Sequence, residues 1–203
     1  MLELLAKGGI LVIPIATCSI LVLAIFLERC IRFAVNRSRS RQVEQQVAEQ
    51  AGAGNLDQAL ETARTSNSPM GRVLEKAIEA RNMDDATRET LIINATEQEV
   101  RGLSAYLQTL ATIGNIAPIL GLLGTIIGMI KAFMVIQEMG GKVNAAVLAG
   151  GIWEAMLTTA LGLSVALPAM LAHSYLLARV DAQESRIQNG LALFFKAMAR
   201  GKA

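Results

Sequence analysis

The chain has 203 residues, of which 53% are hydrophobic but only 4% aromatic, and its mean hydropathy is +0.43. The net charge of +2, with no basic patch interleaved with aromatic residues, argues against a nucleic-acid-binding protein. Charged residues are concentrated in the middle third and the C-terminal tail, a distribution typical of a membrane protein with a polar insertion. The two cysteines, Cys18 and Cys30, form no CxxC motif and are interpreted as free thiols.

The first apolar segment, residues 8–28, is long enough for one membrane span. A secretory signal peptide is the alternative. Against it, Glu3 and Lys7 replace the usual basic run and no A-x-A cleavage site follows. We therefore expect a mature transmembrane helix, preceded by a short periplasmic N-terminus at residues 1–7.

Five arginines follow this span closely: Arg29, Arg32, Arg37, Arg39 and Arg41. The positive-inside rule places residues after 28 in the cytoplasm and the N-terminus outside. We interpret all five as determinants of orientation that contact anionic lipid headgroups.

Residues 29–108 are expected to form a cytoplasmic helical insertion and stalk. Polar capping residues divide it into short helices, namely Asn55 with Gln58 as a capping box, Ser68 before Pro69, and Asp84 or Asp85. From Asp85 the helical pattern meets no proline or glycine cluster, so one helix is predicted to continue past Tyr106 into the second apolar segment.

Two further spans are predicted at residues 109–137 and 145–178, joined by a periplasmic turn at 138–144. Positive charge returns in the C-terminal helix, residues 179–203, which is placed in the cytoplasm. The predicted fold class is an all-α membrane protein with three transmembrane helices and long cytoplasmic helical extensions.

Polar residues inside this hairpin fall at matching depths. Counted from the turn, Thr125 lies level with Thr158 and Thr159, and Glu154 lies about one turn nearer the outside. Glu154 and Thr158 share a helix face, and Thr159 is turned toward a neighbouring helix or subunit.

A carboxylate in a membrane segment usually faces a water-filled path or a partner charge, so Glu154 is the leading functional candidate. The threonines have an alternative role, which is hydrogen bonding to carbonyls of their own helix. The hairpin also holds residues with a packing or anchoring interpretation: Gly121, Gly124 and Gly128 for close helix approach, Pro118 for a freed carbonyl, Lys131 for snorkelling and Trp153 for the interface. His173 is interpreted as a helix-end or interface residue, and a proton relay is the alternative.

No arrangement of residues typical of an enzyme or a metal site is present in the sequence, and no cofactor is expected. Three spans cannot enclose a channel, so function requires an oligomer, a partner or both.

Two motifs resemble the MotA/TolQ/ExbB ion-channel family: APxxGLxGTxxG from Ala117 to Gly128, and GIxEAxLxTAxGL from Gly151 to Leu163, followed by Pro168. The resemblance is strongest to the ExbB/TolQ branch, because flagellar MotA-type subunits usually have four spans. Pro118, the three glycines, Gly162 and Pro168 match as helix-packing positions.

This resemblance implies a homopentamer in the bacterial inner membrane around two copies of a single-span partner similar to ExbD or TolR, which carries the ion-binding aspartate. A TonB- or TolA-like protein is a further implied partner. Thr125, Thr159 and Glu154 match the family's ion path, with H⁺ as the transported ion. Thr158 replaces the alanine usual in the family, and Na⁺ coordination by its hydroxyl is the alternative.

Three functions stay open at this point. The first is a subunit that couples proton-motive force to envelope work, such as TonB-type uptake or Tol-Pal function. The second is a sodium-driven, flagellar or gliding stator subunit. The third is a non-conducting membrane scaffold, in which Glu154 satisfies a neighbour's charge.

Overall fold

The computed structural model describes residues 10–138 and 145–201, and in these ranges every regular element is a helix. The chain divides into two compact units, the first comprising residues 1–27 and 106–175, and the second residues 28–105 and 176–203. Within the described residues, three helices are long and apolar enough to cross a membrane: Val12–Gly52, Leu107–Glu138 and Leu148–Arg200. The predicted turn at 138–144 lies almost wholly outside the described residues, as does the N-terminus.

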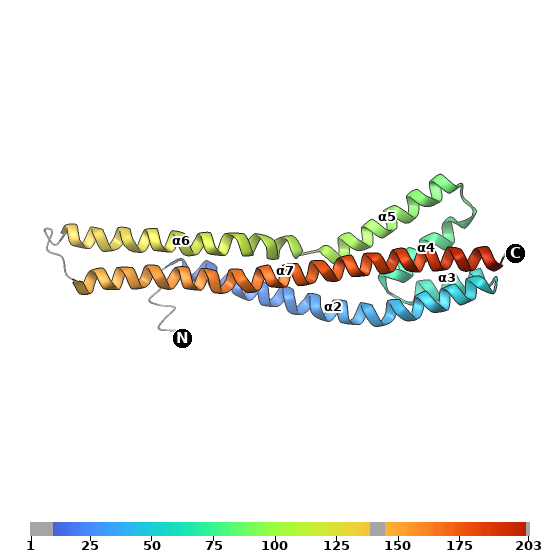
Figure 1. Cartoon of the computed structure of the whole chain (residues 1–203), viewed down its shortest axis with the longest axis horizontal. Coiled ribbons are helices and arrows are strands. Elements are labelled where there is room, and N and C mark those ends of the chain that lie inside the picture. The colour runs from blue at the N-terminus through green and yellow to red at the C-terminus, as the bar shows by residue number, and fades with distance from the viewer. Residues whose placement is uncertain (1–9, 139–144, 202–203) are drawn as a thin grey trace. The chain divides into compact units, whose positions relative to one another are not determined.

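The first unit contains the hairpin predicted from the sequence. Helix α6 (Leu107–Glu138) runs antiparallel to the first part of α7 (Ala145–Gly201), and the two lie side by side (Figure 1). The contact face is made mainly of glycine and alanine. Large apolar side chains such as Ile119, Phe133 and Leu167 are exposed on the outside, where a span would meet lipid or other subunits.

The second unit is built on a compact apolar core. Its helices are the later part of α2 (Val12–Gly52), α3 (Leu56–Thr65), α4 (Pro69–Glu79), α5 (Asp85–Ser104) and the tail of α7. Val47, Leu74, Ile78 and Phe194 are almost fully buried in one cluster, to which α2, α3, α4 and the α7 tail contribute. The tail is therefore a structural part of this unit.

Two predicted helix starts are confirmed. The Ser68 hydroxyl accepts a hydrogen bond from the Gly71 amide at 3.1 Å, and the Asp84 carboxylate accepts one from the Thr87 amide at 2.9 Å. The latter bond lowers the pKa of Asp84, because a backbone donor stabilises the charged form. The predicted capping box at Asn55 is wrong, since its side chain makes no capping hydrogen bond.

Ion pairs connect the short helices on their exposed side. Arg64 of α3 binds Glu75 and Glu79 of α4 at 2.9 and 2.7 Å, and Arg72 of α4 binds Glu99 of α5. Hydrogen bonds from Lys76 and Arg64 lower the pKa of Glu79. These pairs link α3 to α4 and α4 to α5 at the exposed edge of the apolar core.

Replacing Ser68 by alanine is expected to destabilise the start of α4 by about 1 kcal/mol, because the Gly71 amide loses its acceptor in a buried position. Hydrogen exchange of the full chain measures this as faster exchange at Gly71. Thr65→Ala is the control, since the Thr65 hydroxyl is exposed and bonds only to carbonyls of its own helix. Equal exchange in both variants would contradict the capping role.

The prediction that one helix continues from Asp85 into the second apolar segment is wrong. Helix α5 ends at Ser104, and Tyr106 has a φ of 64°, so α6 begins as a separate helix at Leu107. A residue in the left-handed backbone conformation interrupts the helical hydrogen-bond pattern. Here the sequence has no glycine or proline at that position from which the break could have been predicted.

The interpretation of Arg29 as a headgroup contact is also wrong. Its side chain is only 1% exposed and lies 2.9 Å from the Glu28 carboxylate. Its guanidinium donates to the carbonyl of Gly102 at 3.2 Å and approaches that of Leu103 at 3.5 Å. These carbonyls belong to the last turn of α5, where no intrahelical donor is available, so Arg29 caps the C-terminal end of α5.

Candidate ion-path site

The two helices of the hairpin meet along a line of small residues. A Cβ atom added at Gly121 would lie 3.0 Å from Thr159 Cα, and one at Gly128 would lie 3.2 Å from Ala155 Cβ. One added at Gly162 would lie 2.6 Å from the Ala117 carbonyl oxygen. The backbones are therefore too close for larger side chains, as in other small-residue membrane contacts.

Thr158 is buried within this contact. Its side chain occupies the space beside Gly124, where an added Cβ would overlap it. Its hydroxyl donates to the Ala155 carbonyl at 2.8 Å and lies 3.5 Å from the Gly121 carbonyl. The hydroxyl proton is thus bonded to carbonyl oxygens within the hairpin, which is the back-bonding role expected of a threonine in a membrane helix.

Thr159 turns toward the neighbouring helix, as expected. Its half-buried hydroxyl donates to the carbonyl of Gly121 across the helix contact, at 3.1 Å. The hydroxyls of Thr158 and Thr159 therefore approach the same carbonyl. The Gly121 carbonyl is therefore a hydrogen-bond acceptor for both side chains within a contact made mainly of apolar residues.

Thr125 does not join this group. The contacts of Gly124 with Thr158 and of Gly121 with Thr159 place it at the expected level along the hairpin. Its hydroxyl, however, donates to Leu122 in its own helix at 2.6 Å. The hydroxyls of two of the three predicted threonines meet at one carbonyl, and the hydroxyl of the third is bonded within its own helix.

Glu154 has a charged partner that the sequence interpretation missed. Lys131 Nζ lies 3.4 Å from Glu154 Oε1, so the lysine expected to snorkel is directed at the carboxylate instead. Counting residues from the turn leaves these two nearly one turn apart, a distance that a lysine side chain can span. Both line a small crevice with Thr158, Gly124, Ile127, Ile10 and Leu11.

The remaining candidates lie apart from this crevice or serve the packing. Pro118 and Pro168 are inside α6 and α7 without ending either helix. His173 is half-buried in α7 and Trp153 is exposed beside Glu154. Within residues 10–138 and 145–201, no group of three His, Cys, Asp or Glu side chains could hold a metal ion.

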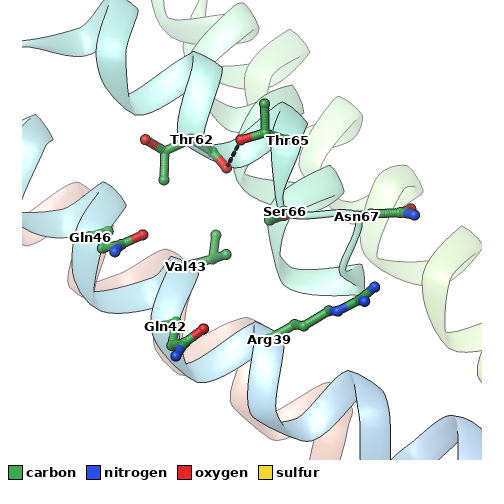
Figure 2. A pocket seen from close by; sticks show the side chains of 8 residues that line it. All are labelled: Arg39, Gln42, Val43, Gln46, Thr62, Thr65, Ser66 and Asn67. Carbon is green, nitrogen blue, oxygen red and sulfur yellow. Dashed lines mark hydrogen bonds between the residues drawn. The ribbon is translucent and has the colours of Figure 1, made fainter.

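A pocket in the second unit has a mainly polar lining. Figure 2 shows it between α2, which supplies Arg39, Gln42, Val43 and Gln46, and the region from Thr62 to Asn67. Its volume is about 510 Å³. The hydroxyls of Thr65 and Ser66 already donate to carbonyls of α3, so they are committed to the local fold.

Comparison with known proteins agrees with the hairpin motifs. Residues 65–189 match the pattern of the MotA/TolQ/ExbB proton channel family. The chain is 31% identical to the biopolymer transport protein ExbB of Neisseria meningitidis over 172 residues, which is 78% of this chain and 76% of that protein. It is 30% identical to ExbB of Salmonella typhimurium over 173 residues, 80% of this chain and 69% of that protein.

A putative biopolymer transport protein ExbB homolog of Methanothermobacter thermautotrophicus is 30% identical over 193 residues. The match covers 92% of this chain but 66% of that relative, so the relative is longer. The family pattern spans more than half of the chain, including both helices of the hairpin up to residue 189. The chain therefore belongs to the MotA/TolQ/ExbB proton channel family, in its ExbB branch.

Proposed function

We propose that this chain is the ion-conducting subunit of an ExbB/TolQ-like energy-transducing motor in the bacterial inner membrane. One observation carries the proposal: a carboxylate, Glu154, lies one helical turn from the hydroxyls of Thr158 and Thr159 at the contact between two apolar helices. Polar groups are expensive in a bilayer and are retained there for ion or proton paths. The family to which the chain belongs supports this role.

In this proposal the hairpin alone does not enclose a path. Five copies surround two copies of a single-span ExbD/TolR-like partner, whose aspartate binds and releases the ion. The glycine contact keeps each hairpin narrow, which lets several copies gather around the partner. The N-terminus is periplasmic and the C-terminus cytoplasmic, and a TonB- or TolA-like protein receives the work.

The threonine pair supports protons as the transported ion. A sodium site needs several oxygen ligands directed at one point. The Thr158 side chain is instead packed against Gly124 in the helix contact and is only 2% exposed, and the Thr125 hydroxyl is bonded to Leu122 of its own helix. Ion-driven motion of the partner then powers work on the envelope, such as TonB-type uptake or Tol-Pal function.

The experiment measures ion flux in proteoliposomes that contain this chain and its co-purified partner. Glu154→Gln and Thr159→Ala are each expected to lower proton flux about tenfold or more, the effect of roughly 1.4 kcal/mol on a barrier. Thr112→Ala is the matched control, because the exposed Thr112 hydroxyl bonds only to Gln108 in its own helix. Repeating the flux measurement with Na⁺ gradients distinguishes proton transport from sodium transport.

Normal flux in both variants would overturn the proposal. The scaffold function predicts a different result, in which Glu154→Gln disrupts assembly instead of flux. The position of Lys131 argues against that function, because Glu154 has a charge partner in its own hairpin and need not satisfy a neighbour's charge. Size-exclusion chromatography of the variants distinguishes the two.

A further inference from the structure

Helix α6 carries a side-chain amide, that of Asn115, in the middle of a long uncharged stretch. No charged residue occurs between Arg101 and Lys131, and Asn115 lies about midway between them. Its side chain is exposed, and among the described residues its amide makes no hydrogen bond. An amide without a hydrogen-bond partner is costly in hydrocarbon, so Asn115 requires a polar neighbour from outside the hairpin.

Asn115 lies on the side of α6 opposite the contact with α7. Ala117 and Gly124 are buried in that contact, and a helix of 3.6 residues per turn rotates Asn115 from them by about 160–180°. Thr112 and Ile119, which lie about one turn to either side of Asn115, are exposed with it. This surface of α6 therefore meets what surrounds the hairpin and does not meet α7.

At the same level, the outer surface of α7 is apolar. A Cβ atom added at Gly114 would lie 2.8 Å from Met170 Cγ, so the two helices meet at this level. Leu167 and Leu171 are exposed on α7 beside this contact, and no charged residue follows in the chain before Arg179. The level belongs to the apolar part of the hairpin, where contact with lipid would suit the leucines but not the amide of α6.

A second polar group directly precedes Asn115 in the chain. Pro118 has no amide hydrogen, so the Gly114 carbonyl lacks the donor that reaches it in a regular helix. The amide and this carbonyl fall within one turn of each other. Buried water molecules in proteins make two to four hydrogen bonds, and groups of this kind supply them.

We infer that Asn115 holds water on the cytoplasmic side of the ion path and is a positioning residue for conduction. The inference rests on the proposed function, since it assigns this surface of α6 to the route between the threonines and the cytoplasm. A carboxamide donates and accepts hydrogen bonds, and it has no titratable proton to pass on. The proton moves along the water that the amide holds. The Thr112 hydroxyl is bonded to the Gln108 carbonyl and has no part in this.

Spin-label accessibility tests the inference in the complex of the full chain with its co-purified partner, reconstituted in lipid. Cys18 and Cys30 are replaced by serine, and a nitroxide is attached in either the Asn115→Cys or the Leu167→Cys variant. Relaxation of the nitroxide by a water-soluble nickel chelate, compared with relaxation by oxygen, distinguishes aqueous from lipid surroundings. The nickel-to-oxygen ratio is expected to be several-fold higher in Asn115→Cys than in Leu167→Cys.

Equally low ratios in the two variants would overturn the inference, because Asn115 would then face lipid or a protein surface. Equally high ratios would also overturn it, because the whole level would then lie outside the bilayer. If Asn115→Cys does not assemble, the nitroxide is moved to Ile119→Cys, which lies one turn away on the same side and leaves the amide in place. The same comparison with Leu167→Cys then decides.

Proton flux supplies a second readout. Asn115→Leu is expected to lower flux about tenfold, whereas Asn115→Gln, which keeps the amide, is expected to retain most of it. Thr112→Ala is the control on the same side of α6, and its flux should be unchanged. Normal flux in an assembled Asn115→Leu complex would overturn the role in conduction.

The inference and the proposed function can fail separately. Normal flux in Glu154→Gln and Thr159→Ala, together with a nitroxide that is accessible to nickel in Asn115→Cys, supports the hydrated surface and removes the proposed function. Flux that is lost in Glu154→Gln but normal in Asn115→Leu retains the function and removes the inference.

Discussion

Replacing Gly162 by alanine is expected to lower the free energy of unfolding of the membrane hairpin by roughly 1–3 kcal/mol, the usual effect of overpacking. The added methyl group would lie 2.6 Å from the Ala117 carbonyl oxygen and 3.1 Å from Gly121 Cα. Both atoms belong to the α6 backbone, which cannot rotate away as a side chain could. The two helices must therefore separate or bend.

The same helix offers a matched control in Gly150→Ala. A Cβ atom at Gly150 would meet nothing within 4 Å, and alanine favours a helix over glycine by about 1 kcal/mol. Thermal unfolding of the purified chain in detergent should give a lower midpoint for Gly162→Ala and an unchanged or higher midpoint for Gly150→Ala. Two equal midpoints would show that the glycine contact does not hold the hairpin together.

Replacing Arg29 by methionine is expected to destabilise the C-terminal end of α5 by roughly 2–3 kcal/mol, because hydrogen bonds from a charged donor are lost and their acceptors stay in place. Arg29 is buried against the last turn of α5 and reaches the carbonyls of Gly102 and Leu103. The expected result is faster amide exchange over residues 101–106 of the full chain, with little change at the buried amides of α4.

Arg32→Met is the control for this substitution. Arg32 carries the same charge one turn later in α2, but its side chain is 55% exposed and its contact with Glu28 is long, at 3.8 Å. Surface pairs of this kind contribute about 0–1 kcal/mol. If both variants exchange alike over residues 101–106, the helix end is held by something other than Arg29.

Features that depend on local sequence were predictable. Ser68 and Asp84 cap helices as expected, because a capping side chain acts on amides only two or three residues away. The level of Thr125, Thr158 and Thr159 along the hairpin followed from counting residues on two straight helices. Regular geometry was sufficient for both.

Features that depend on contacts between distant segments were not predictable in the same way. Arg29 resembles any other basic residue that follows a span, and only the fold brings the end of α5 to it. The break between α5 and α6 at Tyr106 contains no glycine or proline, so local helix propensity did not predict it. The Thr125 hydroxyl is bonded to the carbonyl of Leu122 in its own helix, a choice of side-chain rotamer that counting along the helix does not determine.

The contact of Thr158 with Gly124 has a mechanical consequence. Two helices joined by small residues alone could slide along each other, since their touching surfaces are nearly smooth. The Thr158 side chain fills the gap that glycine leaves at Gly124, so an axial shift would drive it into the neighbouring backbone. The hairpin is thereby locked in register, and a force applied to one helix is transmitted to the other as rigid displacement of the pair.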